Sequence, residues 1–80
     1  MYVYILYSAS SDKYYIGQSE NVEERLKVHN SNKKTYTSPY RPWILKLVIK
    51  KATRSDAIVL EKKLKNLSRE RLISFVNKHS

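Results

Sequence analysis

Two segments with the alternating pattern of β-strands, separated by a short polar turn, open the chain. Residues 2–7, YVYILY, alternate β-branched and aromatic types without a break, and residues 14–18, YYIGQ, form a second strand-like run after a turn at residues 8–12. So short a connection favours an antiparallel hairpin. Because side chains alternate along a strand, Tyr4 and Ile5 should face opposite sides of the sheet.

A helix and a loop should follow this hairpin. Asn21 is a suitable N-cap and Glu24 stands three residues later, a pattern that predicts a helix ending near His29. Val22 and Leu26 would be its buried residues. The polar, aperiodic stretch at residues 30–41 is predicted to be a loop.

The second half predicts one strand and two helices. Residues 43–50, WILKLVIK, alternate and are rich in apolar residues, which favours a strand at the centre of the sheet. Its inward face would carry Trp43, Leu45, Leu47 and Ile49. A helix should start at Thr53 or Ser55, with a buried stripe formed by Ala57, Leu60, Leu64 and Leu67. Ser68 is a good N-cap for a last helix whose inward residues would be Leu72, Phe75 and Val76.

This order of elements, β-β-α-β-α-α, predicts an α+β fold. The fold would be a small three-stranded, mostly antiparallel sheet flanked by three helices. Eighty residues are too few for two independent cores, so residues 1–80 are expected to form a single domain.

Composition excludes several classes of site. The chain contains no cysteine and only two histidines, which excludes disulfides and argues against a structural zinc site. The sequence shows no basic leader and no long apolar run, so we expect a cytoplasmic protein without a membrane partner. We also expect no obligatory protein partner.

The positive charge is concentrated in one half. Residues 41–80 contain eleven basic and three acidic residues, against five and four in residues 1–40, and the whole chain carries +9. A basic surface of this kind usually binds a polyanion, most often nucleic acid. The alternative is a solvated lysine-rich surface, and charge alone does not distinguish a nuclease from a passive binder.

Several residues do not fit a plain core pattern, although each has an ordinary structural interpretation. Glu61 lies at the edge of an apolar stripe, either as a solvated flank or as a buried group with a partner. Arg25 and His29 share a helix face, where the arginine could extend to solvent and the histidine could fill the core boundary. Gly17 would allow the close approach of another backbone or a phosphate, or simply end a strand.

Taken together, these residues resemble the GIY-YIG nuclease superfamily. The second motif is present as Tyr15-Ile16-Gly17, and the first is present in the form Tyr2-Val3-Tyr4. The helix ERLKVHN supplies a matching arginine and histidine, and Glu61 matches the metal-binding glutamate. The resemblance covers roughly residues 2–75. It extends to the small stand-alone members and to the amino-terminal nuclease domains of excision-repair nucleases, which suggests DNA repair.

The resemblance implies a phosphodiester hydrolase that uses one divalent cation, Mg²⁺ or Mn²⁺. The implied catalytic residues are Tyr4, Tyr15, Arg25, His29 and Glu61. Glu61 would bind the metal, which would stabilise the leaving 3′ oxygen, and Arg25 would clamp the scissile phosphate. Tyr4 is the expected general base, provided that nearby cations lower its pKa. Tyr15 would orient water or phosphate, unless the two tyrosines exchange roles, and His29 would relay the proton or hydrogen-bond a tyrosine.

Three functions remain open on this evidence. The first is an endonuclease acting on DNA rather than RNA, with Gly17, Lys46, Lys62 and Lys65 contacting the substrate. The second is a nucleic-acid-binding module that has kept the fold and lost cleavage. Against it, a carboxylate beside phosphates would only repel them. The third is a protein-interaction domain whose charge serves solubility.

Overall fold

The structure, a computed structural model, describes residues 1–31 and 37–79. Strands β1 (Tyr2–Ser8) and β2 (Lys13–Ser19) precede helix α1 (Val22–His29) and the short 3-10 helix η1 (Ser38–Tyr40). Strand β3 (Trp43–Lys50), helix α2 (Arg54–Lys65) and helix α3 (Arg69–His79) complete the chain. The predicted α+β fold and the order β-β-α-β-α-α are confirmed. Part of the predicted loop at 30–41 forms η1, and residues 32–36 of it lie outside the described residues.

The three strands form an antiparallel sheet in the order β2-β1-β3. The hairpin of β1 and β2 is confirmed, but the prediction that residues 43–50 form the central strand is wrong. β1 is central because both of its faces are covered, and its residues 3–6 are all buried. β3 is an edge strand whose side chains Ile44, Leu45 and Val48 are exposed. Apolar content alone did not distinguish the two positions.

A β-bulge in β3 changes which residues share a face. Opposite Ile5 and Leu6 of β1 stand Leu47 and Leu45, so Lys46 is the extra residue. An extra residue reverses the inside–outside alternation beyond it. The predicted inward set is therefore divided, with Leu45 on the face of Leu6 and Leu47 on the face of Ile5.

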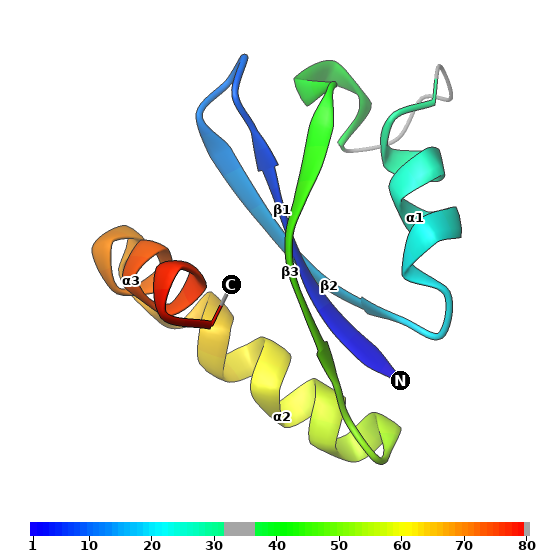
Figure 1. Cartoon of the computed structure of the whole chain (residues 1–80), viewed down its shortest axis with the longest axis vertical. Coiled ribbons are helices and arrows are strands. Elements are labelled where there is room, and N and C mark those ends of the chain that lie inside the picture. Colours follow the sequence, from blue (N-terminus) through cyan, green and yellow to red (C-terminus); the bar gives the residue numbers. More distant parts are fainter. Residues whose placement is uncertain (32–36, 80) are drawn as a thin grey trace.

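The helices cover the two faces of the sheet, as Figure 1 shows. On the face covered by α1, Tyr4, Leu6 and Trp43 form a small buried cluster. On the other face, α2 and α3 cover a larger core, which contains Val3, Ile5, Ile16, Leu47, Ala57, Leu64, Leu72 and Val76. The sheet thus separates an apolar core from a second cluster that contains the first-motif tyrosine.

The helix starts predicted from the sequence are confirmed. The side chain of Asn21 accepts a hydrogen bond from the Glu24 backbone N–H at 3.1 Å, and Thr53 caps α2 in the same way through Asp56. Ser68 accepts from the backbone N–H of Arg71. In α1 the predicted inward residues Val22 and Leu26 are only partly buried, and the buried residue is His29. Among the described residues, no helix has the length and apolar character needed to span a bilayer.

Candidate active site

The two tyrosine motifs meet on the hairpin formed by β1 and β2. Tyr4 of β1 stands directly opposite Gly17 of β2, and its side chain is only 1% exposed. A Cβ atom at position 17 would lie 2.6 Å from the Tyr4 hydroxyl oxygen and 3.0 Å from the Tyr15 ring. Glycine at position 17 therefore makes room for the phenol of Tyr4. The sequence suggested the close approach of a backbone or a phosphate at Gly17, whereas the structure places a side chain there.

Replacing Gly17 with alanine should displace Tyr4. Because the added methyl overpacks a buried site, we expect Gly17→Ala to lower the free energy of unfolding by about 1–3 kcal/mol. Denaturant unfolding measures this cost. In a Tyr4→Leu background the phenol is absent, so the same substitution should cost clearly less. An equal cost in both backgrounds would show that the phenol is not the reason for the glycine.

His29 is joined to Tyr4 by a buried hydrogen bond. Its Nε2 lies 3.0 Å from the Tyr4 hydroxyl and its Nδ1 lies 2.6 Å from Oγ1 of Thr37. The imidazole is 3% exposed. Burial lowers the pKa of His29, and the positive charge of Arg25 lowers it further. The imidazole is therefore neutral at pH 7 and has one ring nitrogen free to accept a proton.

The low pKa of His29 makes the stability of the fold depend on pH. The unfolded chain, with a histidine pKa of about 6.5, binds the proton at a higher pH than the folded chain. The contribution of His29 to the free energy of unfolding is thus complete above pH 6.5 and is lost as the pH falls through the pKa of the folded state. Lowering the pH from 7 to 5 should reduce the melting temperature of wild type more than that of His29→Gln, as measured by thermal unfolding. His79→Gln, at the exposed histidine, should lose as much stability as wild type. An equal loss of stability between pH 7 and pH 5 in all three proteins would show that His29 is not the titrating group.

Three residues that the sequence did not single out for the site hold His29 in place. The carbonyl of Thr37 accepts a hydrogen bond of 2.9 Å from the indole Nε1–H of Trp43. Asn30 bonds both backbone groups of Trp43, accepting from its N–H at 2.6 Å and donating to its carbonyl at 3.1 Å. These contacts fix the start of β3 against the end of α1. Thr37 and Asn30 lie in the predicted loop, where no sequence pattern marked them, and Trp43 was assigned only to the core.

Tyr15 completes an aromatic group around the histidine. Its ring centroid lies 4.7 Å from that of His29 and 6.3 Å from that of Tyr4. The side chain is partly buried, and its hydroxyl makes no hydrogen bond to any residue that the structure describes. This hydroxyl is therefore available to a ligand, whereas that of Tyr4 is already engaged.

Arg25 and Glu61 both act on the Tyr4 phenol. The pKa of Tyr4 is raised, chiefly by burial, with smaller increases from Tyr15 and from the charge of Glu61. The Arg25 guanidinium lowers it, as expected from the sequence, but does not outweigh burial. Arg25 is itself exposed and forms no ion pair among the described residues. The cluster thus contains a neutral phenol beside an arginine without a carboxylate partner.

Glu61 approaches this cluster from the opposite layer. It belongs to α2, which packs along the edge strand β2. The side chain is 18% exposed, and its Oε2 lies 3.2 Å from Nζ of Lys65. Of the two interpretations of Glu61, the structure supports a largely buried carboxylate with a partner. Lys65 is 54% exposed, and a pair four residues apart on a helix contributes little, about 0.3–0.5 kcal/mol, so Lys65 can be displaced.

A single carboxylate is a suitable donor for a hard divalent cation. Magnesium prefers oxygen ligands and is commonly bound by one or two carboxylates together with water and phosphate oxygens. In the part of the chain that the structure describes, no three His, Cys, Asp or Glu side chains come together. One carboxylate at this position therefore fits a magnesium ion that takes its remaining ligands from water or phosphate oxygens.

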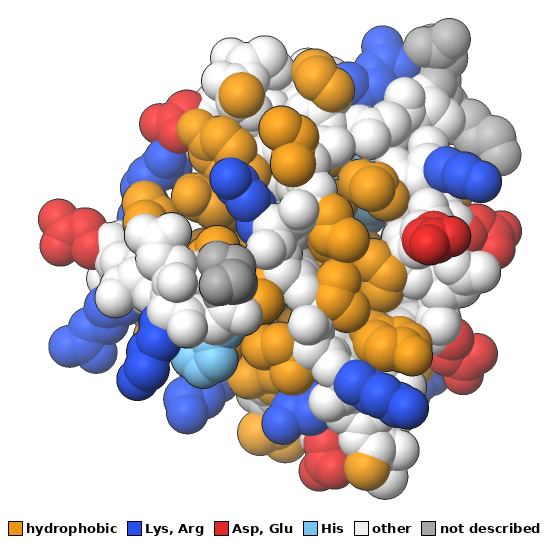
Figure 2. Space-filling view, in the orientation of Figure 1, with side chains coloured by type: hydrophobic (Ala, Val, Ile, Leu, Met, Phe, Trp, Pro, Cys, Tyr) orange, Lys and Arg blue, Asp and Glu red, His pale blue; other side chains and the backbone are white. Residues whose placement is uncertain are grey.

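The lysines predicted to contact substrate lie in different places. Lys65 joins the site through its pair with Glu61, and Lys62 is exposed one residue after Glu61. Lys46 lies over the ring of Tyr7, 5.6 Å from its centroid. By alternation along β1, this is the face of the sheet opposite to Tyr4. Figure 2 shows basic side chains distributed around the molecule, with apolar side chains over its middle.

Comparisons with known proteins agree with this arrangement. Residues 1–74 match the family model described as the GIY-YIG catalytic domain. The chain is also similar to the solution NMR structure of a UPF0213 protein from Bacillus halodurans, with 30% sequence identity and a TM-score of 0.62. That match covers 95% of this chain and 81% of the other. No curated protein matches the sequence. The paired Tyr4 and Gly17, the fold and the family match together show that this chain belongs to the GIY-YIG catalytic domain family.

Proposed function

We propose that this chain is a divalent-metal-dependent endonuclease that hydrolyses phosphodiester bonds in DNA, with residues 1–80 acting as one catalytic domain. The observation that carries the proposal is the buried hydrogen bond between Tyr4 and a neutral His29, beside Arg25 and within electrostatic range of Glu61. A passive nucleic-acid binder needs no proton acceptor at this position. It also gains nothing from a carboxylate that repels phosphates.

The Tyr4–His29 pair would act as the general base. Thr37 can accept from Nδ1–H of His29, which leaves the Nε2 lone pair for the Tyr4 proton. Tyr4 then takes a proton from the attacking water as its own proton passes to Nε2. Phenol alone is a weak base at neutral pH, and burial raises the pKa of Tyr4 further. The transfer therefore needs the histidine.

Substrate binding would activate this pair. In the free protein, Arg25 opposes protonation of His29. A phosphate bound by Arg25 places negative charge beside the guanidinium, so the cost of an imidazolium falls and the pKa of His29 rises. Tyr4 is almost fully buried, and we infer that Arg25 must move toward the phosphate before water reaches the phenol oxygen. The base would thus become effective when substrate is present.

The remaining groups would bind the reacting phosphate. The guanidinium of Arg25 can donate to two phosphate oxygens, where negative charge increases in the transition state. The hydroxyl of the partly buried Tyr15 can orient the water or a phosphate oxygen. Glu61 would hold one Mg²⁺ or Mn²⁺, and this ion supplies positive charge for the leaving 3′ oxygen. Lys65, released from Glu61, would contact the substrate backbone.

Cleavage of labelled nucleic acids tests this proposal. Duplex, single-stranded and branched DNA and an RNA of the same sequence would each be incubated with Mg²⁺, with Mn²⁺ and with EDTA. Because a 3′ oxygen leaves, the expected products carry 3′-hydroxyl and 5′-phosphate ends, which DNA ligase can rejoin. Cleavage that persists in EDTA, or products with 3′-phosphate ends, would contradict the mechanism.

A further inference from the structure

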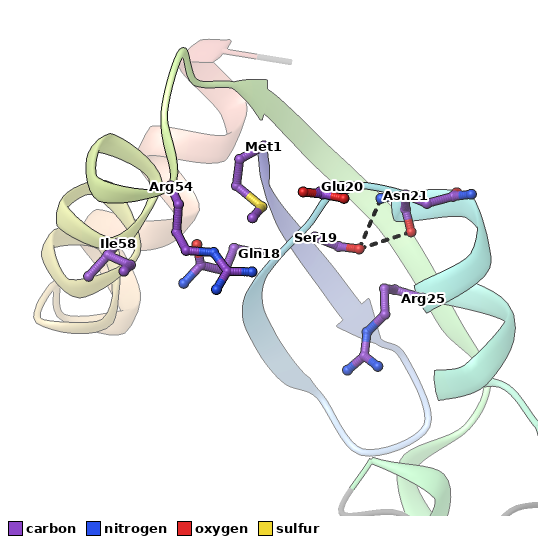
Figure 3. Close-up of a pocket in the computed structure, with 8 residues that line it drawn as sticks. All are labelled: Met1, Gln18, Ser19, Glu20, Asn21, Arg25, Arg54 and Ile58. Carbon is purple, nitrogen blue, oxygen red and sulfur yellow. Dashed lines mark hydrogen bonds between the residues drawn. The ribbon is translucent and has the colours of Figure 1, made fainter.

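A hollow of about 580 Å³ adjoins the catalytic cluster and is not used by the mechanism above. It lies at the end of β2, where Gln18 and Ser19 directly follow Gly17. Arg25 lines it from α1, and Arg54 lines it from the start of α2. In Figure 3 the end of β2 passes between these two arginines, with Gln18 on the side of Arg54. The hollow therefore extends around the open edge of the sheet.

The charges in this hollow are unbalanced. Arg54 is exposed and makes no hydrogen bond or ion pair with any residue that the structure describes, and Arg25 forms no ion pair there. One acidic residue, the exposed Glu20, also lines the hollow. Two guanidinium groups thus face a space with a single carboxylate.

We propose that this hollow binds a phosphate flanking the scissile one, and that Arg54 is a substrate-binding residue. The proposal rests on the proposed nuclease function, because Arg25 would hold the scissile phosphate at one end of the hollow. Arg25 and Arg54 line the same hollow, one from α1 and the other from the start of α2. A nucleic-acid backbone whose scissile phosphate is held by Arg25 would therefore bring a neighbouring phosphate within reach of Arg54. The fork-shaped guanidinium suits a phosphate oxygen pair.

Activity on two substrates tests the role of Arg54. An oligonucleotide has flanking phosphates, whereas bis(p-nitrophenyl) phosphate has none. The ratio of kcat/KM on the oligonucleotide to that on bis(p-nitrophenyl) phosphate should fall about tenfold in Arg54→Ala, the effect of one charge-assisted contact. Arg71→Ala removes the same charge from the groove between α2 and α3 and should change the ratio less than threefold. Equal ratios in the two variants would overturn the proposal.

Binding provides a second readout that does not depend on cleavage. Duplex binding would be measured in EDTA at several salt concentrations. The slope of log affinity against log salt concentration should become shallower by about one in Arg54→Ala, the change expected when one phosphate contact is lost. Glu20→Gln should bind more tightly than wild type, because it removes the one carboxylate of the hollow. If wild type cuts neither substrate, the nuclease proposal fails. The hollow is then judged by binding alone, where identical salt slopes for Arg54→Ala and Arg71→Ala would reject it.

Discussion

Tyr4→Phe should reduce phosphodiester cleavage by about 10²- to 10⁴-fold, the usual contribution of a positioned general base. The substitution removes one oxygen atom and leaves the ring in place above Gly17. In the proposed mechanism the hydroxyl connects the attacking water to the neutral His29, and its bond to Nε2 spans 25 residues of sequence. Without it, the imidazole has no route to the nucleophile.

The loss should be chemical rather than structural. Removing the hydroxyl leaves Nε2 of His29 unpaired, at a cost of about 1–3 kcal/mol, so rates must be compared where both proteins are folded. DNA binding should be unchanged. Tyr14→Phe is a matched control, because Tyr14 lies on the neighbouring strand and packs against the core on the opposite face. If Tyr4→Phe cuts as fast as Tyr14→Phe, Tyr4 is not the base.

Glu61→Gln should separate binding from cleavage. Loss of the carboxylate proposed to bind the metal should lower metal-dependent activity by about 10²- to 10³-fold, since stabilisation of the leaving oxygen would be lost. Binding of DNA in EDTA should be at least as tight as in wild type. The neutral amide no longer repels phosphate, and Lys65 loses its partner at 3.2 Å.

The matched control for this variant is Glu70→Gln. Glu70 lies in the first turn of α3 and carries the same charge at an exposed position. Its substitution should leave cleavage unchanged, because it lies outside the cluster around Tyr4. Weaker DNA binding in Glu61→Gln than in Glu70→Gln would show that Glu61 supports the fold or the interface rather than a metal ion.

Local signals predicted much of the fold. The hairpin follows from residues within one short stretch, and the caps at Asn21 and Thr53 are set by side chains three residues from their partners. The place of β3 could not be predicted in this way. Its apolar residues suited a central strand, but which strand is covered on both faces depends on where α1, α2 and α3 pack. The bulge at Lys46 likewise arises from pairing with β1 and has no mark in the sequence.

The candidate site was predicted as a set of residue types and not as a geometry. The family resemblance identified Tyr4, His29 and Glu61, and the expected alternative that His29 bonds a tyrosine is confirmed. The sequence did not show which tyrosine this is or that Lys65 pairs with Glu61. Thr37 was missed because its role depends on the hydrogen bond from Trp43, which fixes a loop residue beside an imidazole. Arg25 lowers the pKa of Tyr4 as expected, but the sequence did not show that burial of the phenol would outweigh the arginine.

Nicking of supercoiled plasmid DNA by wild type and Glu61→Gln is the most direct test of the central claim. Each protein would be assayed with Mg²⁺, with Mn²⁺ and with EDTA, and DNA binding would be measured on the same preparations. We predict metal-dependent nicking by wild type that disappears in EDTA and in Glu61→Gln, while the variant still binds. Equal nicking by the two proteins, or binding by both without nicking in either metal, would contradict the assignment of this chain as a metal-dependent endonuclease.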